Sequence, residues 1–260
     1  MPIIHAADGT PLNVEVEGRS DGPTLMLSNS LGTDLHMWDP QVAEFARHYR
    51  LVRYDRRGHG KSGVPAGDYT MEQLGRDVLS ILDALKIEKT NWCGLSMGGM
   101  VGQWLGAYAP DRVGKLILSN TSAYYADKQP WNDRMAFARA KGLAALVGPN
   151  MERWFTKEFR ERAPQEVERM TKAFVATPIE GYLGCCAAVR DMDFRDSNPR
   201  IAVPTLVIVG AQDPATTPAV GEALHKQIKG SQIASIDGAH IANLEQPDIY
   251  TRTVLDFLQS

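Results

Sequence analysis

The chain has 260 residues, of which 28 are basic and 31 acidic, so its formal net charge is −3. Because a nucleic-acid backbone is held mainly by lysine and arginine, a chain without a surplus of either is not expected to bind nucleic acid. Hydrophobic residues account for 43% of the sequence and charged residues for 23%. This balance excludes intrinsic disorder and predicts a protein with one large buried core.

Apolar runs in the sequence are short, as the segment Thr205 to Val209 illustrates. A membrane-spanning helix needs roughly 20 apolar residues, and the opening segment MPIIHAADGT lacks the basic and apolar regions of a secretion signal. We therefore expect a soluble, cytoplasmic protein without a membrane partner. The cysteines are odd in number and lack CxxC spacing, which argues against a disulfide framework or a cysteine zinc site. They are Cys93, Cys185 and Cys186.

The predicted elements begin with a hairpin, in which two alternating apolar stretches flank Asp8-Gly9. Short apolar runs follow, separated by segments of helical periodicity, and such runs are typical of strands buried on both faces of a parallel sheet. They are Thr24 to Ser28, Leu51 to Tyr54, Asn91 to Gly94, Lys115 to Ser119, Thr205 to Gly210 and Gln232 to Ile236. This order predicts an α/β fold with a mostly parallel central sheet and helices on both of its faces.

Two helices of this pattern carry clear signals. Thr70 and Gln73 have the spacing of a capping box, and the residues after them form an apolar face with a helical period. That face consists of Leu74, Val78, Ile81, Leu82 and Leu85. A closing helix is predicted over Asp248 to Leu258, with an apolar face formed by Ile249, Val254, Leu255 and Leu258.

Residues 121–200 interrupt the alternation of strands and helices. No strand-like run occurs there, and helical pieces rich in Trp, Phe, Met, Arg and Glu are separated by Gly and Pro. We predict a core formed by residues 1–120 and 201–260, with residues 121–200 inserted as a helical cap. Such an insertion usually acts as a lid over a site, although a helical excursion that only packs against the core would show the same pattern.

The most informative motif is Gly-Leu-Ser-Met-Gly, which matches G-x-S-x-G with Ser96 at its centre. A predicted strand precedes it and a helical period follows. In a sharp turn between strand and helix the central hydroxyl is exposed at the tip, and glycines two residues away on each side avoid backbone clashes. Gly94 and Gly98 occupy those positions, so we predict that Ser96 is a nucleophile rather than an ordinary turn serine.

A serine hydroxyl becomes reactive when a base removes its proton, and the base is oriented by a carboxylate. His240 follows the last predicted strand, at the carboxyl end where α/β sheets gather their sites, and is the predicted base. Asp213, which follows the strand Thr205 to Val209 in the same way, is the predicted acid. Asp237 competes for this role, but it lies only three residues from His240 on the same loop. The remaining histidines, for which surface or structural roles are expected, are His5, His36, His48, His59 and His225.

The tetrahedral intermediate of acyl transfer carries a negative charge that backbone N–H groups stabilise. Met97 directly follows Ser96 and is expected to supply one of these donors. The second is expected from residues 29–33, the loop after the strand Thr24 to Ser28. Counting back from Trp38 places this second donor at Leu31.

One glycine-rich segment, residues 58–63, matches the G-x-G-x-x-G pattern of dinucleotide-binding proteins. However, no apolar helix begins there, and no acid-ended strand follows at the usual interval. The phosphate-binding pattern G-x-x-x-x-G-K-S fails as well, because its first glycine would fall on Asp55. We interpret the segment as a structural glycine loop.

Together these residues resemble the α/β-hydrolase superfamily over the whole chain and, within it, the 3-oxoadipate enol-lactonase family. The matching stretches are SNSLGTDLHMWDPQ from Ser28, YDRRGHGKS from Tyr54, GLSMGG from Gly94, TPIEGYLGCCAAVRDMDFR from Thr177 and GAQDPATTP from Gly210. The first and fourth point to the enol-lactonases, and Asn29-Ser30 replaces the His-Gly pair of most superfamily members. The resemblance implies an α/β-hydrolase fold, a triad of Ser96, Asp213 and His240, and a cap formed by the insertion.

Enol-lactonases of this kind act in bacterial aromatic-acid breakdown, by chemistry that uses no metal or organic cofactor. The implied substrate is a small anionic lactone, whose carboxylate needs a cation in the cap. Arg134 is the candidate, with Trp131 as a wall of the site, although an arginine solvated beside Asp133 would fit the sequence equally well. The other cations named for this role are Arg139 and Arg153.

Two alternative functions stay open at the level of sequence. A carboxylesterase or a perhydrolase would use the same scaffold and triad on another small ester. A hydrolase-like receptor would bind its ligand and turn it over slowly, so fast multiple turnover distinguishes an enzyme from it. Association into homo-oligomers is compatible with the sequence, and the small substrate is the partner that the sequence predicts.

Overall fold

In the computed structural model, which describes residues 3–260, eight strands form one sheet in the order β1-β2-β4-β3-β5-β6-β7-β8. Their bounds are β1 (Ile3–His5), β2 (Pro11–Gly18), β3 (Thr24–Ser28), β4 (Arg50–Tyr54), β5 (Thr90–Leu95), β6 (Val113–Ser119), β7 (Thr205–Gly210) and β8 (Gln232–Ile236). Strand β2 is antiparallel to β1 and β4, whereas the strands from β4 to β8 in this order run parallel. The predicted hairpin and the mostly parallel sheet are confirmed.

Burial along the strands follows their position in the sheet. Every residue of β3 and β7 is buried, as their continuous apolar runs predict. Strand β8 differs, because Gln232, Ile233 and Ser235 are exposed. The prediction that this strand is buried on both faces was wrong. It lies at the edge of the sheet with β7 as its neighbour, so much of its surface is left uncovered.

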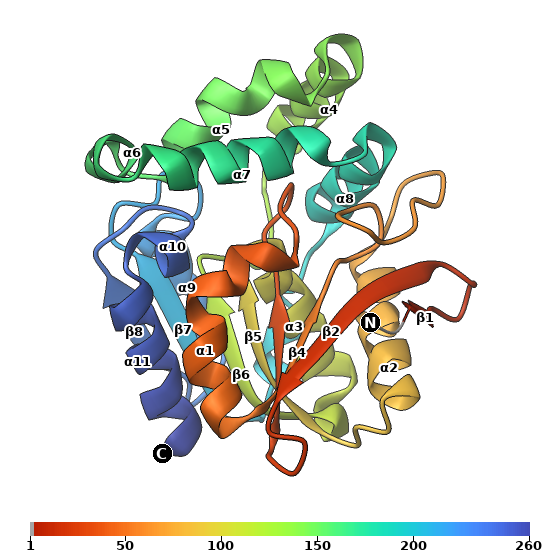
Figure 1. The fold of residues 1–260 in the computed structure, drawn as a ribbon, viewed down its shortest axis with the longest axis vertical. Coiled ribbons are helices and arrows are strands. Elements are labelled where there is room, and N and C mark those ends of the chain that lie inside the picture. Colours follow the sequence, from red (N-terminus) through yellow and green to blue (C-terminus); the bar gives the residue numbers. More distant parts are fainter. Residues whose placement is uncertain (1–2) are drawn as a thin grey trace.

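Helices cover both faces of the sheet, with α1 packed beside α11 on one face and α2 beside α3 on the other (Figure 1). The flanking helices are α1 (Asp39–His48), α2 (Met71–Ala84), α3 (Met97–Tyr108), α9 (Pro218–Gln227), α10 (Ala242–Glu245) and α11 (Pro247–Gln259). Short 3-10 turns are η1 (Leu35–Trp38), η2 (Pro110–Arg112), η3 (Leu143–Leu146) and η4 (Asn198–Arg200). Within residues 3–260 no helix combines the length and the apolar character needed to cross a membrane.

The capping box at the start of α2 is confirmed. The Gln73 N–H donates to Thr70 Oγ1, and the Thr70 N–H donates to Gln73 Oε1, each over 3.1 Å. For α11 the prediction was wrong at Ile249, whose side chain is 48% exposed. Tyr250 is buried in its place, whereas the predicted burial of Val254 and Leu258 is confirmed; counted from Tyr250, the buried apolar residues are spaced by four, seven and eight. They are Tyr250, Val254, Phe257 and Leu258, with Thr251 beside them.

Between β6 and β7, five helices lie over the edge of the sheet at which the parallel strands end (Figure 1). They are α4 (Gln129–Lys141), α5 (Val147–Trp154), α6 (Lys157–Arg162), α7 (Pro164–Ala176) and α8 (Ile179–Asp191). The two ends of this insertion meet at an isolated antiparallel bridge between Tyr124 and Asp193. The helices therefore cover the loops in which the predicted site residues lie.

A buried ion pair joins the loop after β4 to α2. Arg57 donates to both carboxylate oxygens of Asp77, over 2.7 and 2.5 Å, and to Asp8 over 2.8 Å. The side chains of Arg57 and Asp77 are each only 3% exposed. In such a buried pair each charge depends on the other, because neither is solvated by water.

We predict that Asp77→Asn lowers the free energy of unfolding by about 3 kcal/mol, because it leaves a buried guanidinium without its main counter-charge. Asp21→Asn is the matched control. Asp21 pairs with Arg19 over 3.2 Å on the exposed surface, where water screens the charges, so its substitution should leave the free energy of unfolding nearly unchanged. Urea denaturation of both variants measures the difference, and equal effects would contradict the prediction.

Candidate active site

Ser96 lies in a tight turn between the end of β5 and the start of α3. Its φ of 55° and ψ of −115° are strained for a residue with a side chain. A Cβ atom on Gly94 would collide with the Gly98 carbonyl, and a Cβ on Gly98 would collide with the Ser28 carbonyl. The two glycines are therefore required by the close approach of the backbone. The strand, turn and helix follow one another as the motif predicts.

The loops after β7 and β8 bring Asp213 and His240 together. His240 Nδ1 lies 2.7 Å from Asp213 Oδ2, and both side chains are buried. The competing carboxylate, Asp237, is exposed and accepts a hydrogen bond from Gln212 Nε2 over 2.8 Å. Of the two predicted candidates, Asp213 is the one in contact with His240.

The Asp213 carboxylate is held by several donors besides His240. Oδ1 accepts the backbone N–H groups of Ala215 and Thr216 over 2.7 and 3.0 Å. Oδ2 accepts the Thr216 hydroxyl over 2.6 Å and Asn120 Nδ2 over 3.0 Å. Burial on its own would raise the pKa of Asp213, but the His240 charge and these hydrogen bonds outweigh it and lower the pKa to about 2. The carboxylate therefore stays ionised and can accept a hydrogen bond from the Nδ1–H group of His240.

Sequence reasoning overlooked Asn120 and Thr216 as partners of the acid. Asn120 directly follows β6 and has a φ of 46°, so the chain turns sharply there and directs the amide toward the neighbouring loop after β7. Its position offered a usable signal, because the carboxyl ends of β6 and β7 lie side by side in a parallel sheet. Thr216 lies three residues after Asp213, within reach of a turn that bonds back to its carboxylate.

The predicted oxyanion donors both border the cavity that Ser96 and His240 also line. Leu31 belongs to the loop after β3, and Met97 is the first residue of α3. Within residues 3–260 neither N–H group donates to a protein atom. Both residues thus have a backbone N–H group without a protein acceptor and line the same cavity as Ser96.

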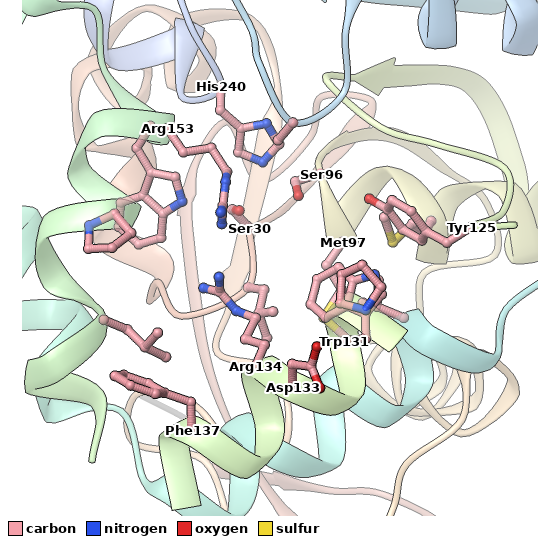
Figure 2. A pocket seen from close by; sticks show the side chains of 18 of the residues that line it. Ser30, Ser96, Met97, Tyr125, Trp131, Asp133, Arg134, Phe137, Arg153 and His240 are labelled. Atoms are coloured by element: carbon pink, nitrogen blue, oxygen red, sulfur yellow. The ribbon is translucent and has the colours of Figure 1, made fainter. Parts of the chain in front are cut away.

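The cavity has a volume of about 640 Å³ and lies between the strand-end loops and the inserted helices (Figure 2). Its floor is formed by Ser30, Leu31, Ser96, Met97 and His240. The insertion supplies most of the remaining walls, with Tyr125, Trp131, Arg134, Phe137, Arg153 and Trp154 among them. This volume suits a small organic molecule. Six of the seven predicted site residues, from core and insertion, therefore line one cavity, and the seventh, Asp213, contacts His240.

Two arginines of the insertion line this cavity in different ways. Arg134 is half-buried, with Nε donating to the Tyr182 hydroxyl and Nη2 to Asn150 Oδ1, each over 2.5 Å. Its guanidinium also lies 6.0 Å from the centre of the Trp131 ring. Arg153, on α5, has no carboxylate within 4 Å among the residues that the structure describes. Burial, together with the nearby charge of Arg134, lowers the pKa of the Arg153 guanidinium.

Two of the three arginines considered as cap cations line the cavity. Arg134 faces the cavity and is half-buried. Arg153, named only as a substitute, lines the same cavity and keeps its donors free of carboxylates. Arg139 is exposed and does not line the cavity.

Comparisons with known proteins agree with this fold. The family described as alpha/beta hydrolase fold matches residues 23–247. Two proteins of Acinetobacter baylyi named 3-oxoadipate enol-lactonase 2 and 1 are 41% and 40% identical to this chain, covering 98% and 99% of it and 97% of each relative. A crystal structure of the enol-lactonase from Burkholderia xenovorans superimposes with a TM-score of 0.97 at 44% identity, over the full length of both chains.

An esterase from Thermogutta terrifontis has a similar fold, with a TM-score of 0.93 at 27% identity, over 99% of this chain and 97% of the esterase. The similarities extend across both the sheet and the inserted helices, since nearly the whole chain is aligned. The Gly-x-Ser-x-Gly turn of the chain lies within the matched family segment. The chain is therefore a hydrolase that belongs to the alpha/beta hydrolase fold family.

Proposed function

We propose that this protein is a serine hydrolase that opens the enol-lactone of 3-oxoadipate. The observation that carries the proposal is a cavity with Ser96 and His240 at its floor and two arginines in its walls. Such a cavity fits a small ester that carries a negative charge. The identity of about 40% with proteins named 3-oxoadipate enol-lactonase supports the same substrate. We infer further that the reaction belongs to aromatic-acid catabolism in the cytoplasm.

In the proposed reaction, Ser96 Oγ attacks the lactone carbonyl carbon while His240 accepts the hydroxyl proton. Asp213 orients His240 and stabilises the imidazolium that forms. The carbonyl oxygen becomes an oxyanion beside the N–H groups of Leu31 and Met97. When the intermediate collapses, the ring C–O bond breaks, and the His240 proton goes to the departing enol oxygen. An acyl-enzyme remains on Ser96.

Hydrolysis of the acyl-enzyme follows the same steps, with water in place of Ser96 as the attacking group. His240 takes a proton from the water, which attacks the acyl carbon, and then returns that proton to Ser96 Oγ. The product leaves as a carboxylate. An enol is a better leaving group than an alkoxide, and its conversion to a ketone makes ring opening hard to reverse. None of these steps calls for a metal or an organic cofactor.

The substrate's own carboxylate is proposed to bind in the cap part of the cavity. Arg134 is the predicted partner, and Trp131 forms a wall beside it. Two of the Arg134 donor atoms are already engaged, which holds the guanidinium in place and leaves Nη1 available. Arg153 is the alternative partner, because it faces the same cavity with no carboxylate bound. Both arginines favour an anionic substrate over a neutral ester.

A carboxylesterase is the second candidate function, and the likeness to the Thermogutta terrifontis esterase favours it. The proposed triad would serve a neutral ester as well as a lactone. The arginines distinguish the two functions, because a neutral ester has no use for them.

We expect Ser96→Ala to reduce kcat by about 10⁶ without unfolding the protein, since the attacking group is lost. Initial rates on the enol-lactone, followed by the loss of ultraviolet absorbance, are compared with rates on an aryl ester and a saturated lactone. The wild-type enzyme should prefer the enol-lactone and complete many turnovers, unlike a receptor. Retention of a tenth of the activity by the variant would refute the assignment of Ser96.

We expect Asp213→Asn to lower kcat by roughly 10⁴-fold, because an amide in place of the carboxylate no longer holds His240 with its proton on Nδ1. Asp237→Asn is the matched control on the neighbouring loop, and its rate should remain near that of the wild type. Both variants are measured as purified proteins with intact circular dichroism. The opposite ranking would move the role of the acid to Asp237.

Replacement of the arginine proposed to bind the carboxylate should weaken the binding of the anionic substrate only. We expect Arg134→Met to remove a charge-assisted hydrogen bond of about 1.5–3 kcal/mol, which corresponds to a loss of about 10- to 150-fold in kcat/KM, mainly in KM. The neutral aryl ester should be hydrolysed at an unchanged rate. Arg139→Met, on the exposed side of the same helix, is the control.

The same measurement on Arg153→Met compares the two cavity arginines. A charge-selective loss confined to this variant would transfer the carboxylate-binding role from Arg134 to Arg153. Equal losses on the charged and neutral substrates would mean that the arginine supports the structure of the cap and does not bind the carboxylate.

A further inference from the structure

The glycine loop after β4 lies directly against the loop that carries the proposed oxyanion donor Leu31. His59 of the glycine loop is fully buried, although a surface position was one of the expectations for it. The Gly32 N–H donates to His59 Nε2 over 2.9 Å. Gly32 is the residue after Leu31 and has a φ of 77°, so the chain turns at this contact. His59 thus holds the backbone next to the proposed donor.

The contact defines the state of the His59 ring. Since Nε2 accepts a hydrogen bond, the ring proton is on Nδ1, which lies 3.8 Å from Cys185 Sγ on α8. Burial, reinforced by the positive charge of Arg56, lowers the pKa of His59 to about 3. The imidazole therefore remains neutral and keeps its acceptor atom at any pH near neutrality.

Arg56, three residues earlier in the same loop, contacts the other side of the Leu31 segment. Its Nη2 donates to the Asn29 carbonyl, which also accepts the Gly98 N–H over 3.1 Å. Unlike its neighbour Arg57, the buried Arg56 has no carboxylate partner among residues 3–260. Its Nε and Nη1 atoms are buried without a hydrogen-bond partner. An unpaired buried cation destabilises a fold.

The remaining contacts of the Leu31 loop are weaker. The Ser30 N–H donates to the sulfur of Met37 over 3.2 Å, and a thioether is a weak acceptor. The Thr33 hydroxyl donates to the Ser30 carbonyl within the loop itself. The strongest anchors of this segment to other elements are therefore those at Asn29 and Gly32, on either side of Leu31.

We propose that Arg56 and His59 form a clamp that fixes the loop of residues 29–32 and thereby aims the Leu31 N–H at the substrate's carbonyl oxygen. Both are positioning residues, since they act through the backbone and do not touch the substrate. The inference rests on the proposed serine mechanism. It gives the glycine loop a role in catalysis and explains why the fold retains a buried cation that has no counter-charge.

The clamp should affect the transition state more than substrate binding. The oxyanion exists only after attack by Ser96, so a misplaced donor lowers kcat and leaves KM nearly unchanged. Loss of one oxyanion donor typically lowers kcat by about 10²- to 10³-fold. A displaced donor should reduce kcat by roughly 10- to 100-fold, because part of the interaction survives.

The experiment compares two substitutions at His59. His59→Phe keeps a ring but removes the acceptor for the Gly32 N–H, whereas His59→Gln keeps an acceptor atom near the position of Nε2. We expect kcat to fall about 10- to 100-fold in His59→Phe and to recover at least partly in His59→Gln. KM should change less than about threefold in both. His225→Phe, on α9 and bonded to Ser231, is the control that leaves kcat unchanged.

Arg56→Met tests the other end of the clamp and does not depend on the folding of the His59 variants. Because it removes an unpaired buried charge, we expect Tm to stay equal or rise while kcat falls at least about 10-fold. A residue of merely structural importance would give the opposite pattern, with a lower Tm and full activity in the folded fraction.

A boronic acid that forms a tetrahedral adduct with Ser96 provides a second readout. Its affinity should fall in parallel with kcat in His59→Phe and Arg56→Met, while the affinity for a flat carboxylate product should not change. Rates are measured on both the lactone and a neutral aryl ester, because the oxyanion site serves every acyl substrate, and the losses should be equal.

These outcomes separate the two proposals. Full activity of Ser96→Ala would overturn the serine mechanism. Loss of activity in Ser96→Ala, together with wild-type kcat and boronate affinity in Arg56→Met and His59→Phe, would overturn the clamp alone. A loss that appears only in KM, or only on the charged lactone, would also overturn it.

Discussion

A backbone turn that leaves no room for side chains at its flanks sets the geometry of this candidate active site. The carbonyls of Ser28 and Gly98 approach so closely that only glycine fits at positions 94 and 98. The same turn is tied to its neighbours, since the Ser96 N–H donates to the Ser119 carbonyl over 2.8 Å and the Gly98 N–H donates to Asn29. Ser96 is thereby placed at the meeting point of the loops after β3, β5 and β6.

Charged side chains of both signs lie around this turn. Asp213 does not itself line the cavity, but it is surrounded by donors and remains ionised beside His240, which does. The cations Arg134 and Arg153 lie across the cavity in the inserted helices. Arg56 lies behind the loop proposed to bind the oxyanion. Two exposed carboxylates, Asp127 and Asp133, also line the cavity, so the proposed preference for an anionic substrate depends on the two arginines and not on a uniformly positive site.

Periodicity and turn chemistry predicted much of the fold because they depend on neighbours in the chain. The runs Thr24 to Ser28 and Gln232 to Ile236 are the observed strands β3 and β8, and Thr70 caps α2 through Gln73. Errors arose where burial depends on what lies alongside. Ile249 is exposed because Tyr250 sets the inward register of α11, and β8 is exposed because no strand lies beyond it.

The amino-acid order already predicted that Ser96, His240 and Asp213 lie near one another, because a parallel sheet gathers the loops after its strands at one edge. It left Asp237 as a rival to Asp213, and Arg153 as a substitute for Arg134. Those choices depend on distances between segments far apart in the chain. The 2.7 Å contact of Asp213 with His240, the support from Asn120 and the burial of His59 beneath Gly32 arise only when β3, β4, β6 and β7 are packed side by side. These contacts cannot be predicted from local sequence, since the two residues of each contact lie far apart in the chain.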